Sequence, residues 1–192
     1  MMTKIAVIVG STRDGSFNRA LGALAAARLA AHGAEVTAID LGALDLPVYS
    51  AALEANAFPP DALKLKEVLA AQDGLLVVSP EYNGSVPALL KNAIDWASRP
   101  TGDEGLVALT AFRGKAAAIM SASVSPFGGL RGLMHLRQIL GTIQMLVIPD
   151  QVLVPNAHLA FDEAGDLRDA LPASLVDATA ARLVAVAGAL AV

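Results

Sequence analysis

The sequence contains no cysteine, and this absence removes several kinds of chemistry at once. A chain without thiols has no disulfides, no thiolate ligands for a metal, and no cysteine nucleophile. The three histidines, His32, His135 and His158, are far apart and lack the close spacing that is typical of a zinc site. We therefore expect no metal site. The missing cysteines are compatible with a reducing cytoplasm, which we take as the expected compartment.

Charged residues are also scarce, at 17 % of the chain, and aromatic residues make up 4 %. Fourteen Lys and Arg against 18 Asp and Glu give a formal net charge of −4, with no long run of one sign. This pattern lacks the basic footprint of a nucleic-acid-binding protein. A hydrophobic content of 55 % argues against disorder. The length of 192 residues suits one core, so we expect a single domain over residues 1–192.

Long hydrophobic runs are missing from both ends of the sequence. The first apolar segment begins at Ile5 and ends by Gly10, which is too short for a signal peptide. The most apolar late stretch, Leu183 to Val192, is also too short to cross a bilayer. We therefore expect no membrane partner.

Short runs of β-branched and aliphatic residues alternate with amphipathic segments along the chain. The runs are nearly continuous, as is typical of strands that are covered by helices on both faces. Because strand and helix alternate, we predict an α/β fold with a parallel, doubly wound sheet. The predicted strands are residues 5–9, 35–39, 75–79, 116–120 and 144–148, and the predicted helices are residues 16–32, 60–72, 85–96, 129–140 and 172–190.

Two long stretches, residues 41–59 and 152–170, show no regular pattern, and loops of that length are often functional. In the last predicted helix, the apolar residues Leu175, Leu183, Val186 and Leu190 share one face with the polar Thr179. We expect this face to cover the sheet.

The first predicted strand leads into a loop with the composition of an anion site. The helix N-terminus that follows it is where doubly wound folds place a phosphate. Arg13 offers a charged fork, and Gly10 and Gly15 let backbone amides approach closely. The loop is neither G-x-G-x-x-G nor a P-loop, which argues against a dinucleotide or ATP site. The alternative is an ordinary polar turn in which Ser16 caps the helix. Short polar side chains in this loop are Ser11, Thr12, Ser16 and Asn18.

The loop after the third predicted strand, residues 79–87, is suited to a flat ring. With a strand order of 2-1-3-4-5, the loops after the first and third strands flank the same crevice. Tyr82 supplies an apolar face, and backbone N–H groups near Asn83 and Gly84 are available to polar ring atoms. The alternative is a turn in which Ser85 caps the next helix and Pro87 lies in its first turn. Glu81 is then a plain surface carboxylate.

These motifs, in this order and spacing, resemble the NADPH-dependent FMN reductase family, which includes bacterial quinone, chromate and azo-dye reductases. The resemblance extends from residue 5 to about residue 150. The matching pieces are Gly10-Ser11-x-Arg13-x-x-Ser16-x-Asn18, then Pro80-Glu81-Tyr82-Asn83-Gly84-Ser85-Val86-Pro87, then Leu90-Lys91-Asn92-Ala93-Ile94-Asp95-Trp96, and finally Gly128-Gly129-x-Arg131 with His135-Leu136-Arg137-Gln138. Ala88 departs from the glycine that the family often has, and Ser125-Pro126-Phe127 is a bulkier run that is expected to narrow the pocket mouth.

The resemblance implies a flavodoxin-like, three-layer α/β/α fold with a five-stranded parallel sheet of order 2-1-3-4-5. It also implies non-covalent FMN, with NADPH or NADH as the hydride donor. Carried over residue by residue, the phosphate site is Ser11, Arg13, Ser16, Phe17 and Asn18, the ring site is Pro80, Glu81, Tyr82, Asn83 and Gly84, and the closing loop is Ser121, Ala122 and Ser123.

The implied activity is ping-pong hydride transfer from NAD(P)H through FMN to a small acceptor such as a quinone, flavin, chromate or azo compound. No side chain need act as acid, base or nucleophile because the flavin carries the chemistry, so no catalytic residue is assigned. The alternative is a flavodoxin-type electron carrier that acts through a protein partner. The modest acidity, the single Trp and Arg13 in the phosphate loop argue against that alternative.

The family usually forms dimers or tetramers, so a homodimer or homotetramer is expected. The helix at residues 130–140 carries apolar residues that suit an interface, although the same face would equally cover the sheet; they are Leu130, Leu133, Met134 and Leu140. Trp96 is expected in the core or at a subunit contact, His135 at a packing or interface position, and Asp95 beside a basic neighbour.

Overall fold

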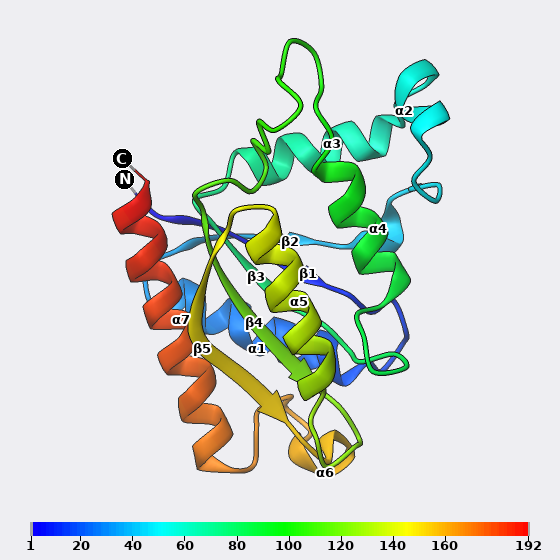
Figure 1. Ribbon diagram of the computed structural model, residues 1–192. Coiled ribbons are helices and arrows are strands. Elements are labelled where there is room, and N and C mark those ends of the chain that lie inside the picture. The colour runs from blue at the N-terminus through cyan, green and yellow to red at the C-terminus, as the bar shows by residue number, and fades with distance from the viewer. Residues whose placement is uncertain (1, 192) are drawn as a thin grey trace.

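The computed structural model describes residues 2–191 and contains a five-stranded parallel sheet with helices on both faces (Figure 1). The strand order is β2-β1-β3-β4-β5, as predicted, and every neighbouring pair is parallel. The strands are β1 (Lys4–Val9), β2 (Glu35–Ile39), β3 (Gly74–Val78), β4 (Ala116–Ala122) and β5 (Leu146–Val154). The helices are α1 (Phe17–Ala31), α2 (Ala51–Asn56), α3 (Pro60–Ala70), α4 (Ala88–Ala97), α5 (Leu130–Thr142), α6 (Ala157–Ala160) and α7 (Ala170–Leu190), with a 3₁₀ helix η1 at Leu41–Ala43.

Two hydrophobic cores lie on the two faces of the sheet. Helices α1 and α7 cover one face, and α3, α4 and α5 cover the other. Every residue of β3 and β4 is buried because both faces of these central strands are covered. This double burial is the physical reason for the continuous apolar runs in the sequence.

Helix α1 begins and ends where the sequence signals predict. Ser16 is its N-cap, and its Oγ accepts a hydrogen bond from the backbone N–H of Arg19 at 3.4 Å. Gly33 follows the helix with a φ of 84°. Within the helix, a Cβ on Gly22 would lie 2.7 Å from Val9 Cγ2, so this glycine lets α1 lie close to β1.

Strand β5 is longer than predicted and lies further along the chain. Its pairing with β4 is interrupted by a bulge, because Ala117 pairs with Val147 while Ile119 pairs with Gln151. Pro149 lies in this bulge. A proline within a sheet is tolerated at an edge strand, where its missing N–H costs no ladder hydrogen bond. The proline breaks the apolar pattern, which is why the strand predicted at residues 144–148 stops too early.

The two stretches predicted as irregular contain more structure than expected. Residues 41–59 include η1 and α2, and residues 152–170 include the end of β5 and the short helix α6. These elements are three to six residues long, so their hydrophobic periodicity was too brief to recognise. By contrast, residues 98–115, between α4 and β4, form a long connection that protrudes from the molecule in Figure 1.

The buried face of α7 overlaps the predicted apolar face only in part. Leu175 and Leu190 are 44 % and 43 % exposed, whereas Thr179 and Leu183 are buried as expected. Small residues determine which face of α7 is buried because they allow the helix to pack closely on the sheet. A Cβ on Gly74 would lie 2.9 Å from the Cβ of Ala187. The buried stripe is Val176, Thr179, Ala180, Leu183 and Ala187.

Among residues 2–191, α7 is the one helix that is long and apolar enough, by length and composition, to cross a membrane. In the structure it packs against α1, β4 and β5. Of the stretch predicted to be too short for a bilayer, Leu183 to Val192, residues 183–190 are the end of this longer apolar helix. Val192 itself lies outside the described residues.

Candidate functional site

The loops that follow β1 and β3 meet at the carboxyl edge of the sheet. The strand order reverses at β1, which has β2 on one side and β3 on the other. The backbone N–H of Gly10 donates to Val78 O at 2.8 Å. A Cβ on Gly10 would lie 3.2 Å from Leu90 Cδ2 and 3.5 Å from Pro80 Cδ. The predicted phosphate loop and the predicted ring loop are therefore in contact, at the position where open α/β sheets bind ligands.

The first loop gathers hydroxyl groups, a guanidinium and free backbone N–H groups at the start of α1. Ser11 and Ser16 are buried, and the guanidinium of Arg13 is exposed. Because the first turn of a helix has no intrahelical acceptors for its N–H groups, those of Phe17 and Asn18 are available to a ligand. Gly15 has a φ of 64°, and a Cβ there would face open space. Ser16 is thus the N-cap of α1 and also a residue of the predicted anion site, so the two interpretations of this loop do not exclude each other.

The side-chain amide of Asn18 forms hydrogen bonds to the backbone of β4 through both its nitrogen and its oxygen. Its Nδ2 donates to Ala122 O at 2.8 Å, and its Oδ1 accepts from Ala122 N at 2.9 Å. The residue is 4 % exposed. This side chain joins the first loop to the end of β4 instead of pointing toward open space above the loop.

Phe161 contacts the first loop, and nothing in the sequence marks this contact beyond the position of Phe161 in a long irregular stretch. Its ring stacks on that of Phe17, with 6.2 Å between centroids and 6° between planes. Arg13 lies over the Phe17 ring, with Cζ 5.9 Å from the centroid. The segment after α6 is therefore part of the wall around the first loop.

The second loop contains a tight turn from Tyr82 to Ser85. The two residues exchange backbone hydrogen bonds of 2.9 Å and 3.0 Å. Asn83 and Gly84 both have positive φ, 52° and 77°, as Asn-Gly does in two-residue hairpins. Tyr82 is 51 % exposed, and a Cβ on Gly84 would meet no neighbouring atom. The turn thus offers an aromatic face and open backbone to a ligand.

Ser85 does not cap the following helix, contrary to one alternative. Helix α4 begins at Ala88, with Pro87 as N-cap and no side-chain cap. The Oγ of Ser85 instead lies 2.9 Å from His135 Nδ1 on α5. This hydrogen bond links the ring loop to α5.

Glu81 is not a plain surface carboxylate, because its side chain is 7 % exposed and faces the start of α5. Gly132 N donates to its Oε2 at 3.0 Å, and Arg131 Nε donates to its Oε1 at 2.8 Å. Burial alone would raise the pKa of Glu81. The Gly132 N–H and the Arg131 guanidinium outweigh burial and hold that pKa below its ordinary value. The carboxylate thus anchors the ring loop to α5.

Ser121 and Ala122, which are predicted in the loop after the fourth strand, are the last two residues of β4 itself, and Ser123 is the first residue after it. Ser121 is fully buried, and its Oγ has no hydrogen-bond partner. Gly129, with a φ of 89°, presses against it so closely that an added Cβ would overlap Ser121 Oγ. Ser123 is half-buried, and its Oγ accepts from Ser125 N at 3.2 Å. Of the three residues predicted to close the site, Ser123 is therefore the most accessible.

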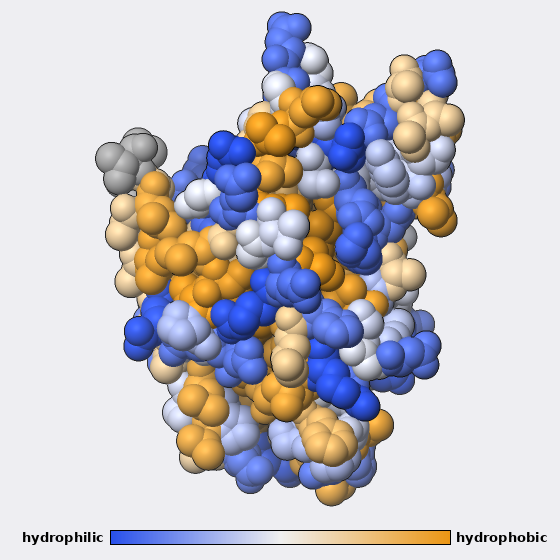
Figure 2. Space-filling view, in the orientation of Figure 1, coloured by the Kyte–Doolittle hydropathy of each residue, from blue (hydrophilic) through white to orange (hydrophobic). Residues whose placement is uncertain are grey.

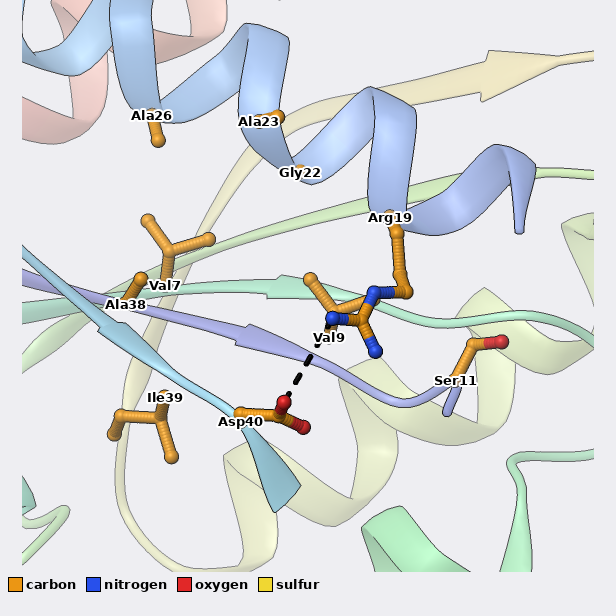
Figure 3. A pocket seen from close by; sticks show the side chains of 10 residues that line it. All are labelled: Val7, Val9, Ser11, Arg19, Gly22, Ala23, Ala26, Ala38, Ile39 and Asp40. Atoms are coloured by element: carbon orange, nitrogen blue, oxygen red, sulfur yellow. Dashed lines mark ion pairs between the residues drawn. The ribbon is translucent and has the colours of Figure 1, made fainter. Parts of the chain in front are cut away.

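A separate hollow of about 280 Å³ lies between α1 and the edge of the sheet formed by β1 and β2 (Figure 3). It exists because α1 presents small side chains there, Ala23 and Ala26, opposite Val7 and Ala38. At its rim, Arg19 and Asp40 form an ion pair of 3.7 Å. Ser11 borders this hollow, and the turn of the second loop does not.

Several other side chains lie where the sequence predicts. Trp96 is fully buried and donates to Pro47 O at 2.7 Å. Asp95 pairs with Lys91 at 2.7 Å. On α5, Leu133 and Leu140 are buried under the sheet while Met134 is 62 % exposed, so most of this face covers the core. Within residues 2–191, no group of three or more His, Asp or Glu side chains is placed to hold a metal ion.

The fold is flavodoxin-like, and comparisons with known proteins define the family. Residues 3–159 match the family described as NADPH-dependent FMN reductase. The chain is 39 % identical over 164 residues to a 2-hydroxy-1,4-benzoquinone reductase of Burkholderia sp., which covers 85 % of this chain and 82 % of the relative. It is 38 % identical over 167 residues to an NAD(P)H-dependent FMN reductase of Pseudomonas aeruginosa, which covers 86 % and 85 %.

A solved structure agrees with this assignment. The flavoenzyme NAD(P)H:(acceptor) oxidoreductase of Paracoccus denitrificans superposes with a TM-score of 0.83 at 29 % identity, over 98 % of both chains. The chain belongs to the NADPH-dependent FMN reductase family. It is therefore an enzyme, an NAD(P)H-dependent oxidoreductase, and the electron-carrier alternative is set aside.

The residues of the two loops fit the FMN that this family uses. A phosphate needs N–H and O–H donors and positive charge, and Ser11, Arg13, Ser16 and the start of α1 supply them. A flat ring needs an open, partly apolar edge, and Tyr82 with the Asn83-Gly84 turn supplies that. Both sets lie on adjoining loops at the carboxyl edge of the sheet.

Proposed function

We propose that this chain binds FMN non-covalently between the loops after β1 and β3 and reduces a small quinone with NAD(P)H. One observation carries the proposal: an anion-binding loop and a ring-sized turn meet where the strand order reverses. A phosphate and a flat ring of the same molecule require this arrangement. The names of relatives, a 2-hydroxy-1,4-benzoquinone reductase and quinone reductases, support a quinone as acceptor.

The first loop would hold the phosphate. Arg13 and the hydroxyls of Ser11 and Ser16 donate hydrogen bonds, and the N–H groups of Phe17 and Asn18 add the positive end of the α1 dipole. Such hydrogen bonds to a charged group are stronger than those between neutral groups.

The second loop would hold the ring system. Tyr82 and the Asn83-Gly84 turn face it, and Pro80 and Glu81 keep the loop rigid, the latter through its hydrogen bonds to α5. A rigid loop loses less conformational entropy on binding. Ser121, Ala122 and Ser123 would form the wall on the β4 side.

The chemistry that FMN supplies when bound is the acceptance of a hydride from the nicotinamide and its delivery to the acceptor. The protein contributes binding, orientation and shielding from water. No side chain at the crevice is assigned as an acid or base, because solvent can supply the protons. Donor and acceptor would use the same space in turn, which predicts ping-pong kinetics.

The test is the absorption spectrum of the purified protein, followed by release and identification of the flavin. We expect flavin absorbance, FMN after release, and NAD(P)H oxidation that depends on an added quinone. Double-reciprocal plots at several quinone concentrations should be parallel, as in ping-pong kinetics. A protein with no flavin absorbance, and with no NAD(P)H oxidation after FMN is added, would refute the proposal.

We also propose that the protein is a homodimer or homotetramer and works in the cytoplasm. A groove of about 430 Å³ between α4 and α5 has an apolar floor of Ile94, Ile139 and Ile143, which suits a second copy of the chain. Light scattering on the eluted protein measures its mass in solution, and cell fractionation locates it. A mass of one chain at micromolar concentration would contradict the assembly.

A further inference from the structure

The side chain of Asn18 takes the place of a missing strand beside β4. The peptide groups of Met120 and Ala122 face the β3 side of this strand, and Met120 O accepts from Ser79 N at 2.9 Å. Strand β3 ends at Val78, so Ala122 lies beyond its last pairing residue. Asn18 supplies the two hydrogen bonds that Ala122 would otherwise lack. Asn18 Nδ2 donates to Ala122 O at 2.8 Å, and Ala122 N donates to Asn18 Oδ1 at 2.9 Å.

This tie is buried and joins distant parts of the chain. Asn18 and Ala122 are 4 % and 3 % exposed, so water does not compete for these hydrogen bonds. An unpaired buried peptide group would be costly, which makes the tie a firm constraint. Only a planar amide offers a donor and an acceptor side by side, as a peptide group does.

Asn18 is the second residue of α1, and the tie therefore fixes the start of this helix above the end of β4. The N–H groups of Phe17 and Asn18 belong to this turn, and Ser16 precedes it. We infer that Asn18 is a positioning residue for the flavin phosphate, which acts by holding these backbone donors in place and not by contact of its own side chain. The inference rests on the proposed FMN site.

The test compares the binding of FMN and of riboflavin, which has the same ring but no phosphate. Asn18→Ala is expected to weaken FMN binding about tenfold or more, the effect of losing about one hydrogen bond to a charged group, and to weaken riboflavin binding much less. The preference for FMN should fall accordingly in fluorescence titrations. A merely structural role would lower both affinities together.

Asn92→Ala is the matched control. Asn92 makes the same kind of tie on α4, donating to Pro47 O at 3.0 Å and accepting from Tyr49 N at 2.8 Å, away from the first loop. We expect its loss to lower Tm and to leave the preference for FMN over riboflavin unchanged. Asn18→Leu keeps the size but neither donates to Ala122 O nor accepts from Ala122 N, and it adds no charge, so it serves if Asn18→Ala does not fold.

Amide hydrogen exchange on the protein without flavin separates positioning from direct contact. If Asn18 positions the loop, exchange should speed up in Asn18→Ala at residues 16–19 and at Ala122 before any flavin is added. An unchanged preference for FMN, or a reduced preference with unchanged exchange at these residues, would overturn the inference. If the wild-type protein binds neither flavin, the proposed function fails, while the exchange experiment still reports on the tie.

Discussion

The ring of Phe161 lies parallel to the ring of Phe17 and joins two segments that are distant in sequence. Phe17 is the first residue of α1, and Phe161 pairs with Leu167 across a turn that follows α6. A hollow of about 550 Å³ lies between this turn and the first loop. The two stacked rings therefore connect the first loop to the turn after α6 beside this hollow, and the guanidinium of Arg13 lies over the Phe17 ring.

Phe161→Ala should weaken FMN binding by about 0.5–1.5 kcal/mol, the typical worth of an aromatic pair beyond its buried area. The reason is that Phe17, whose ring lies beneath Arg13, loses the ring against which it stacks. Flavin fluorescence titration measures the affinity. The matched control is Phe58→Ala, which removes an edge-on contact with Trp96 far from the first loop and should alter stability alone. Equal FMN affinities in both variants would contradict this role of Phe161.

Arg13→Ala should weaken FMN binding by roughly 1.5–3 kcal/mol, the range for hydrogen bonds to charged groups. Arg13 is the exposed cation of the first loop, and Arg19 nearby is already paired with Asp40. Arg13→Lys keeps the charge and should recover part of the affinity. An unchanged affinity by fluorescence titration would show that Arg13 does not hold the phosphate.

The link between Glu81 and α5 should make stability depend on pH in the acidic range. The pKa of Glu81 is lower in the folded protein than in the unfolded chain, where it is about 4.3. Its contribution to stability is therefore complete above that value and is lost as pH falls through the folded pKa. Chemical denaturation of wild type and Glu81→Gln between pH 3 and pH 7 measures this, with Glu163→Gln, on the exposed turn, as control.

We expect the stability difference between wild type and Glu81→Gln to shrink as the pH is lowered. If the stability difference between the two proteins were the same at every pH, the ionised carboxylate of Glu81 would add nothing to the link with α5.

Lys66 holds the protruding connection between α4 and β4. Its side chain is 4 % exposed, and its Nζ donates to Arg99 O at 2.6 Å, to Thr101 Oγ1 at 3.0 Å and to the carboxylate of Glu104. Lys66→Met should cost about 3 kcal/mol of unfolding free energy, because it leaves Glu104 without its partner. The double variant Lys66→Met with Glu104→Gln should cost less. A double variant as unstable as the sum of both single changes would exclude this coupling.

Much of the fold follows from local patterns that can be read along the sequence. The central strands are buried on both faces, so their apolar runs are continuous, and the helices carry caps such as Ser16 and Gly33. Strand β5 was misplaced because the bulge at Pro149 is a property of its pairing with β4. The buried face of α7 was misjudged because Ala187 against Gly74 sets how closely the helix packs.

The candidate site was only partly accessible to the same reasoning. The two loops were located because each follows a strand and contains unusual polar and glycine residues. The partners of Asn18 and Glu81 lie 104 and about 50 residues away, so their roles depend on tertiary contacts. Phe161 contributes through stacking on Phe17, and no local pattern marks such a contact.

The bulge in β5 has a consequence for how molecules of this protein can associate. Apolar surface lies over this strand between α5 and α7, and Leu146 is 52 % exposed (Figure 2). Such an edge would ordinarily invite a strand from another molecule. Here Pro149 has no N–H to offer, and Arg137 already donates to the carbonyl oxygens of Val147 and Ile148. The proline and the Arg137 hydrogen bonds therefore make this edge a poor template for a strand from another molecule.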